Sequence, residues 1–301
     1  MKYFIILLSL LYISVAVNSQ SILELKEDAI KGDPLSQYFL ASKYHSGEGV
    51  NKDLSEAVYW YEKSAEQGYV TAQVVLGEMY WFGTGVAKDN QKALYWLEKG
   101  ANQDNAWAQS NTGRLYLGAK DIPTNYSKAL FWIEKSANQG MDNAYFTTGM
   151  LYSLGRGAPK NYQKAIYWLT KAANRSDELA CYELGMLYYN GKGTPQDYNK
   201  AFLWLEESAA LGNIDAQFRV GYMYFHNEGV SGDLEKAEYW YKKSADSGNV
   251  QAQYHLGLLY NLLRNKQQAA KYIKKVIENG NDYLKEKAEQ LWEEEELYKY
   301  Q

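Results

Sequence analysis

Gly-x-Gly pairs, three histidines and one cysteine are the features of this 301-residue sequence that could take part in chemistry. Glycine-rich loops can cradle a phosphate, because they present free backbone N–H groups to the ligand. These pairs lack the preceding strand and the signature residues of a phosphate loop, so turns between helices are the better interpretation. They lie at Gly47/Gly49, Gly83/Gly85, Gly155/Gly157 and Gly191/Gly193.

The histidines and the cysteine are weak candidates for a site. His45, His226 and His255 are far apart in the sequence and share no spacing with carboxylates that would indicate zinc. Cys181 stands where five related segments carry glutamine, which favours packing over a catalytic thiol. A single cysteine also excludes an internal disulfide. We therefore predict no catalytic residue, metal site or cofactor, and expect that the protein is not an enzyme.

The elements that carry these residues repeat every 36 positions. A small residue followed three positions later by tyrosine recurs from Ala41 and Gly77 to Gly257. A fixed period in this range is typical of helical repeats that stack into a solenoid. We therefore predict an all-α fold, an α-solenoid of antiparallel helix pairs. A tryptophan marks the second helix of six repeats, at Trp60, Trp96, Trp132, Trp168, Trp204 and Trp240.

The ends of the predicted helices have local signals. Asp or Asn precedes each second helix and can accept hydrogen bonds from the free backbone N–H groups of the first turn. Glycine closes most repeats and suits a left-handed position after a helix. A glycine inside a helix, such as Gly77, costs roughly 1 kcal/mol, so we expect it where the two helices of a repeat cross at close approach. The N-cap residues are Asp53, Asp89, Asn125, Asn161, Asp197 and Asp233.

We divide the chain into four parts. Residues 1–19 combine a positive start with a short apolar run and read as a signal peptide cleaved after Ser19, the alternative being an uncleaved anchor. Residues 20–33 are predicted to form an N-terminal capping helix, residues 34–280 seven repeats of which the last is shortened, and residues 281–301 a C-terminal capping helix. The mature protein is thus expected to be exported, periplasmic or secreted (lumenal if eukaryotic), without a membrane span.

The charge of the chain excludes one class of partner. The formal net charge is −4, and acidic and basic residues alternate along the repeats. No basic stripe is present that could neutralise a phosphate backbone, so we expect no binding to nucleic acid.

The repeat unit resembles the Sel-one-like repeat family, which is related to the tetratricopeptide repeats. The resemblance rests on Ala-x-x-x-Leu-Gly-x-x-Tyr, a Gly-x-Gly-Val loop, an Asp, and Lys-Ala-x-x-Trp-x-x-Lys within 36 residues, as in 72–101. It covers about residues 36–280. It implies a right-handed superhelix that binds other proteins as an adaptor or scaffold, with members in endoplasmic-reticulum quality control and among exported bacterial proteins.

The third repeat departs most from this pattern. Ala119 and Asp121 replace its loop glycines. Because the stability of a solenoid is a sum of repeat and neighbour terms, we predict a weak link there, with 118–125 the internal loop most labile to exchange. Some secreted relatives carry a cysteine pair in every repeat, and this chain has none.

One stripe on the first helices stands apart from the predicted core face. It lies three positions before and one and four positions after the central glycine, at a different angle around the helix from the core residues. By analogy with tetratricopeptide proteins we expect it to line the concave groove and to bind an apolar or aromatic segment, with packing between repeats as the alternative. Its predicted residues are Trp81, Phe146, Met150, Tyr182, Met186, Tyr189, Phe218, Tyr222 and Phe225.

The sequence therefore predicts an exported protein–protein interaction scaffold. Its partner would be another protein or a peptide, and the resemblance suggests host interaction or envelope regulation. The alternative is a cell-wall ligand binder or an envelope hydrolase, since some relatives have been described as binding β-lactam-like ligands. The Ser-x-x-Lys motif of penicillin-binding proteins is absent from this sequence, which disfavours that alternative.

Overall fold

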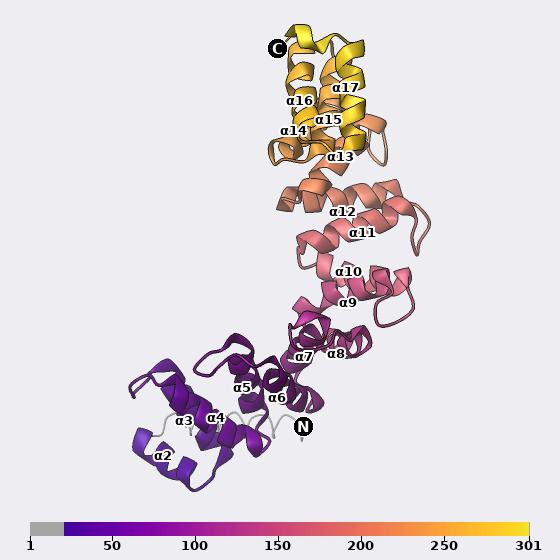
Figure 1. Cartoon of the computed structure of the whole chain (residues 1–301). Coiled ribbons are helices and arrows are strands. Elements are labelled where there is room, and N and C mark those ends of the chain that lie inside the picture. The colour runs from indigo at the N-terminus through magenta and orange to yellow at the C-terminus, as the bar shows by residue number, and fades with distance from the viewer. Residues whose placement is uncertain (1–20, 301) are drawn as a thin grey trace. The chain divides into compact units, whose positions relative to one another are not determined.

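The computed structural model describes residues 21–300, which form antiparallel α helices without any strand in that range (Figure 1). The predicted all-α architecture of helix pairs is confirmed. The predicted signal peptide and its cleavage site lie outside the described residues, and the predicted handedness of the superhelix stays a prediction. Within the described range, no helix has both the length and the apolar composition that a bilayer crossing requires.

The helices alternate between a first and a second helix of each repeat. The first helices are α3 (Pro34–Ser46), α5 (Val70–Phe82), α7 (Ala106–Gly118), α9 (Asp142–Leu154), α11 (Glu178–Asn190), α13 (Ile214–His226) and α15 (Val250–Leu262). The second helices are α4 (Leu54–Glu66), α6 (Asn90–Asn102), α8 (Tyr126–Asn138), α10 (Tyr162–Ala173), α12 (Tyr198–Leu211), α14 (Leu234–Asp246) and α16 (Lys266–Asn279). Helix α2 (Ile22–Ile30) precedes them, and α17 (Asp282–Glu294) and the 3-10 helix η1 (Leu297–Tyr300) follow.

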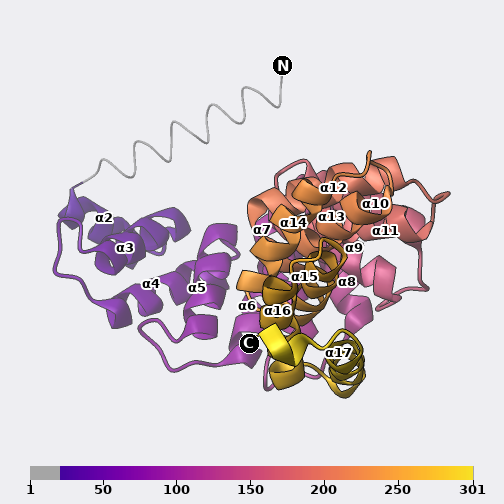
Figure 2. The ribbon, with the colours of Figure 1, turned by 90° about the horizontal axis from the view of Figure 1, so that it is seen from above.

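The chain divides into two compact units. The first unit runs to Leu151 and includes Gly155–Pro159, and the second comprises Tyr152–Leu154 and the chain from Lys160 onwards. In the first unit each helix from α2 to α8 packs against the next one along the chain (Figure 1). In the second unit the same holds from α10 to α17, and α15, α16 and α17 lie together at its C-terminal end (Figure 2). Each unit is thus built from contacts between neighbours in sequence.

The second helices begin where the sequence predicts. The Asp89 side chain accepts a hydrogen bond of 2.9 Å from the backbone N–H of Lys92, and Asn125 accepts one of 3.0 Å from Lys128. The other predicted Asp and Asn residues cap their helices in the same way. The glycines that close repeats have the expected positive φ, for example 89° at Gly68 and 94° at Gly248. These caps define where the helices begin and end.

The glycines inside the first helices mark the crossing points of the helix pairs. A Cβ on Gly113 would lie 2.3 Å from Cγ1 of Ile133 and 3.0 Å from the backbone oxygen of Ala129, both on α8. No side chain fits at that distance, so the predicted close approach is confirmed. At Gly77, Gly113, Gly185 and Gly221 the residue that follows the tryptophan supplies this contact, while Trp132 itself is buried in the core.

Buried glutamines join the repeats near the helix ends. Gln73 Nε2 donates a hydrogen bond of 3.1 Å to the backbone oxygen of Ala65. Cys181 holds this place in the fifth repeat, with its Sγ 3.8 Å from the backbone oxygen of Ala173. Burial raises the pKa of the Cys181 thiol to about 11, so the thiolate is disfavoured. The packing interpretation of Cys181 therefore agrees with its surroundings.

Candidate protein-binding face

Glycines at the centres of the first helices decide which side of each helix is open. A Cβ on Gly185 of α11 would lie 2.7 Å from Leu205 Cγ, and a Cβ on Gly221 of α13 would lie 2.8 Å from Tyr241 Cδ1. The glycine side therefore faces the second helix of the same repeat, and another side of the first helix can meet a partner. We call that side of α11, α13 and α15 the first-helix face of the second unit, with Tyr182, Met186, Tyr189, Arg219, Tyr222, Phe225, His226 and His255 as its residues.

Five of the predicted binding residues lie together on this face. Tyr182, Met186 and Tyr189 of α11 and Tyr222 and Phe225 of α13 are all half-buried and pack against the same core cluster. Each of these residues is thus partly exposed. Their proximity is what a shared binding surface requires, and their role in binding stays a prediction.

Phe218, the sixth predicted residue of this unit, is only 6% exposed. Its ring centroid lies 5.9 Å from that of Tyr241 and 5.3 Å from that of His255. Phe218 therefore packs between repeats, which is the alternative considered for its register position. Any contribution to binding would come through the side chains that it supports.

The remaining predicted residues belong to the first unit. Trp81 is half-buried at the end of α5, where its ring stacks on Phe82 at 5.3 Å and lies 5.2 Å from the guanidinium carbon of Arg114. Phe146 and Met150 are half-buried on α9. The predicted set is thus divided between the two units.

Arg219 of α13 is a residue of the face that sequence reasoning missed. Its guanidinium carbon lies 5.0 Å from the ring centroid of Tyr189 and 5.6 Å from that of Tyr222. Within residues 21–300 no hydrogen bond or ion pair joins it to an acceptor, and its buried Nε has no partner. It stands two positions before Gly221, outside the stripe considered above. A lone cation within an aromatic stretch of the sequence was the signal that could have found it.

Two histidines approach the same rings. His226 and His255 both contact Tyr222, with ring centroids 4.1 and 5.6 Å away. Burial lowers the pKa of His255 to about 4, and the positive charges of His226, Arg219 and Lys287 add to this effect. His255 is therefore neutral at pH 7, and Arg219 is the cation at the centre of the face. In the described part of the chain, no group of three or more His, Cys, Asp or Glu residues could hold a metal ion.

The nearby carboxylate of Glu228 is engaged elsewhere. The Tyr189 hydroxyl donates a hydrogen bond of 2.6 Å to Glu228 Oε2. Burial, together with this hydrogen bond, raises the pKa of Tyr189 far above its ordinary value, so the phenol stays protonated. Glu228 forms no ion pair with Arg219 in the described structure. The face thus presents aromatic rings beside the Arg219 guanidinium, whose N–H groups can still donate hydrogen bonds to a partner.

Comparison with known proteins shows what the chain is similar to. A family model described as Sel1 repeat matches residues 34–69, 70–105, 108–141, 143–177, 179–213, 214–249 and 250–281. None of the curated proteins compared with the chain matches it significantly.

Two solved structures share both fold and sequence with the chain. A protective antigen of uropathogenic Escherichia coli strains that displays an SLR fold is 33% identical over 89% of the chain, with a TM-score of 0.78. The chain spans 58% of the length of that antigen. A Sel1 repeat protein from Oxalobacter formigenes is 31% identical over 90% of the chain and 79% of its own length, with a TM-score of 0.65.

Proposed function

This chain belongs to the Sel1-repeat family, and from that premise we propose that it is an exported scaffold that binds a partner protein through the first-helix face of its second unit. Sel1-repeat proteins generally act as scaffolds for protein–protein interaction. The bound segment would carry a carboxylate flanked by apolar or aromatic side chains. Host interaction and envelope regulation are the settings that we propose for it.

The position of Arg219 is the observation that carries this proposal. A half-buried guanidinium without an acceptor has lost part of its hydration without gaining a hydrogen bond. A carboxylate of the partner can accept two of its N–H groups at once, and such paired bonds are strong and directional. Tyr189 and Tyr222 beside it offer rigid contact area at little entropic cost.

The proposed export rests on the N-terminal sequence and on one relative. Residues 3–17 are almost wholly apolar behind Lys2, as in a signal peptide. One similar protein is a protective antigen of uropathogenic Escherichia coli strains. This similarity supports a place outside the cytoplasm for this chain. The intact mass of the exported protein should correspond to a chain that begins at Gln20. A mass that retains residues 1–19 would refute the cleavage.

Capture experiments with two matched variants test the binding face. Arg219→Gln removes the guanidinium from the first-helix face of the second unit, whereas Arg114→Gln removes an arginine from the first helix α7 of the first unit. Full chains carrying either change would be used as bait for proteins from the source organism's own envelope and from eukaryotic lysate. We expect Arg219→Gln to lose about tenfold or more of the capture of at least one protein that Arg114→Gln retains, since a charged hydrogen bond contributes about 1.5–3 kcal/mol.

A second variant tests the aromatic part of the face. Tyr189→Ala, Tyr222→Ala and Phe225→Ala combined should abolish capture of the same protein. Because all three side chains are half-buried, we expect a lower melting temperature but a folded chain with unchanged helical content. If both variants fold and still bind the partner as the wild type does, the face is not the binding site. Turnover of cell-wall fragments by the wild type would instead support the enzymatic alternative.

A further inference from the structure

The loop after α7 differs from the loops of the other repeats. In the second repeat, two loop positions carry glycines with positive φ, Gly83 at 75° and Gly85 at 71°. In the third repeat these positions are Ala119 and Asp121, and Ala119 has an extended backbone with φ −75° and ψ 138°. The loops of the fourth and fifth repeats keep both glycines.

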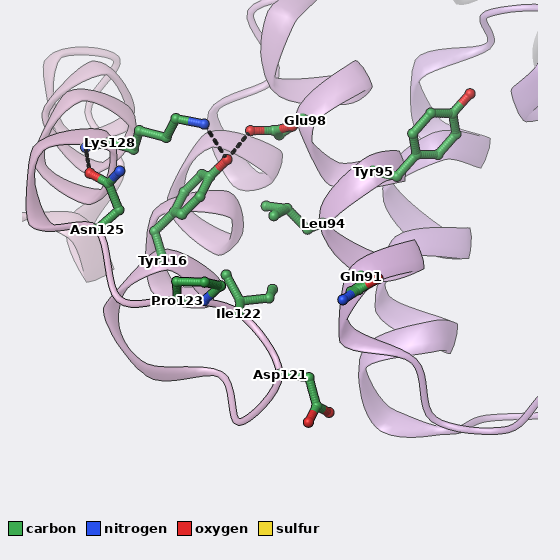
Figure 3. A pocket seen from close by; sticks show the side chains of 10 residues that line it. All are labelled: Gln91, Leu94, Tyr95, Glu98, Tyr116, Asp121, Ile122, Pro123, Asn125 and Lys128. Atoms are coloured by element: carbon green, nitrogen blue, oxygen red, sulfur yellow. Dashed lines mark hydrogen bonds between the residues drawn. The ribbon is translucent and has the colours of Figure 1, made fainter.

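The second of these glycines allows the loop to touch the preceding second helix. A Cβ on Gly85 would lie 2.7 Å from the backbone oxygen of Leu54 in α4, and a Cβ on Gly193 would lie 2.4 Å from Tyr162 Cβ in α10. Asp121 has a side chain that such an approach would exclude. In the third repeat a cavity of about 460 Å³ lies between α6 and the loop (Figure 3).

The middle of this cavity is apolar. Leu94 of α6 is half-buried, and Ile122 of the loop and Tyr116 of α7 are 7% and 6% exposed. The exposed residues Tyr95 and Pro123 also line the cavity, together with the polar side chains of Gln91 and Asn125. A side chain entering from solvent would therefore find apolar contact along its length.

Carboxylates mark the two ends of the cavity. Figure 3 shows Glu98 and Asp121 at opposite ends, with Leu94 and Ile122 between them. The Tyr116 hydroxyl donates a hydrogen bond of 2.5 Å to Glu98 Oε1. Over the described residues, the second oxygen of Glu98 and the Asp121 carboxylate form no hydrogen bond or ion pair.

One cation lines the cavity, and it is already engaged. Lys128 Nζ donates a hydrogen bond of 3.0 Å to the Tyr116 hydroxyl and lies 4.9 Å from the centroid of that ring. Two carboxylates and one ammonium leave an excess of one negative charge around an apolar middle. This charge pattern is complementary to a cationic side chain with an apolar stem.

We propose that the cavity between α6 and the loop 119–124 binds an arginine side chain of a partner protein. Its methylenes would lie over Leu94 and Ile122, and its guanidinium would donate to the free oxygen of Glu98, with Asp121 adding attraction at the other end. An arginine stem covers apolar surface while its planar head forms directional bonds to a carboxylate, which a lysine ammonium does not match. This contact is separate from the first-helix face, because it lies in the first unit and on a second helix.

Short blocked peptides test the cavity without knowledge of the partner. The probes are acetyl-Gly-Arg-Gly-amide and its citrulline counterpart, which has nearly the same shape but no charge. Each is titrated into the full chain while the backbone amide resonances of α6 and of the loop are followed by NMR. We expect saturable shifts at 91–98 and 119–125 with the arginine peptide, and binding weaker by about tenfold with citrulline, since charged hydrogen bonds are roughly twice as strong as neutral ones.

Three variants locate the binding. Glu98→Gln keeps an acceptor for Tyr116 but should weaken arginine binding about tenfold. Glu62→Gln is the matched control, because Glu62 holds the same position on α4, whose neighbouring loop carries Gly83 and Gly85. It should leave the binding unchanged. Ala119→Gly with Asp121→Gly should let the loop close on α6 and abolish the shifts.

Several outcomes would overturn the proposal. Equal binding of the citrulline peptide would show that charge is not recognised. Stronger binding of a norleucine peptide would make the cavity a site for an apolar side chain. Absence of saturable shifts at 91–98 in the wild type would mean that the cavity binds no arginine, whatever the first-helix face does. A Glu98→Gln chain that keeps its spectrum and its affinity would likewise exclude the proposed contact.

Discussion

The first-helix surfaces of the two units are built from the same register positions. Their charged side chains are hydrogen-bonded in the first unit, whereas Arg219 of the second unit has no acceptor among the described residues. In the first unit the Glu78 carboxylate accepts hydrogen bonds of 2.5 Å from Trp107 Nε1 and 3.0 Å from Asn111 Nδ2. Arg114 Nη1 donates one of 3.5 Å to the Asn111 side-chain oxygen. Anion, cation and amide thus satisfy one another on the surface of α5 and α7.

In the second unit the register position of Asn111 is held by Arg219. The rings of Tyr189 and Tyr222 lie beside its guanidinium, and the Glu228 carboxylate accepts a hydrogen bond from the Tyr189 hydroxyl. The two surfaces share their backbone register but differ in the pairing of their charged side chains. Periodic backbone geometry therefore does not by itself make a binding surface. A surface whose polar groups are already paired gains little from a partner, whereas an unpaired cation among rings can gain much.

The largest effect that we expect is a loss of stability confined to one of the two units. Trp132→Ala removes a buried side chain of the first unit and should destabilise it by about 3–5 kcal/mol. Since solenoid stability is a sum of repeat and neighbour terms, denaturant unfolding should split into two steps, with the second unit retaining its midpoint. Trp168→Ala, in the second unit, should lower the other step. A single transition that shifts as a whole in both variants would contradict this separation.

A smaller effect depends on pH and belongs to the second unit alone. Because the pKa of His255 is about 4 in the folded chain, against about 6.5 when unfolded, the unfolded chain binds more protons between these values. The stability of the second unit should therefore be full above about pH 6.5 and fall as the pH drops towards 4, by about 3 kcal/mol in total. In α7 the equivalent position is Asn111, which does not titrate.

His255→Phe provides the control for this pH dependence. The substitution keeps a ring against Phe218 and Tyr241 and removes the titrating group. Thermal or denaturant unfolding at pH 7, 5.5 and 4.5 should show a smaller loss for the variant than for the wild type. Carboxylates that titrate near the lower end affect both chains alike, so the difference isolates His255. Parallel pH curves for the two chains would refute the prediction.

Sequence reasoning succeeded where the determinants are local or strictly periodic. The caps at Asp89 and Asn125 depend on a side chain and the backbone of the next turn, and Gly113 depends on a partner at a fixed offset. Cys181 was recognised because the other repeats show what its place does. Each of these relations joins residues less than one repeat length apart or recurs at the repeat period, which is why the helices could be placed from the sequence.

The site was predicted less completely because it depends on side chains of neighbouring repeats. Phe218 has the same register position as Tyr182, yet Tyr241 and His255 bury it, whereas Tyr182 stays half-exposed. The approach of His226 to His255 spans 29 positions and two helices, so spacing along the chain concealed it. Arg219 lay outside the chosen stripe, although the charge and the rings around it were visible in the sequence.

The smallest expected effect compares one carboxylate in each unit. Trp107→Phe removes one donor to Glu78, which keeps its bond to Asn111, so the first unit should lose less than about 1 kcal/mol. Tyr189→Phe removes the hydroxyl that donates to Glu228 in a partly buried hydrogen bond. The stability of the second unit should therefore fall by about 1–2 kcal/mol. The order of the two losses follows from the paired surface in one unit and the single bond in the other.

Denaturant unfolding of both variants, followed by probes for each unit, measures this order. Tyr189→Phe keeps the ring in place, so its loss of stability reports the hydrogen bond. Trp107→Phe also replaces the indole, which is 43% exposed, with a smaller ring, so its loss is an upper limit for that hydrogen bond. If Trp107→Phe costs more than Tyr189→Phe, Glu78 depends on the Trp107 bond and Asn111 does not compensate for its loss. The first-helix surface of the first unit would then be as sensitive to the loss of one bond as that of the second, and the contrast from which the binding face is inferred would rest on Arg219 alone.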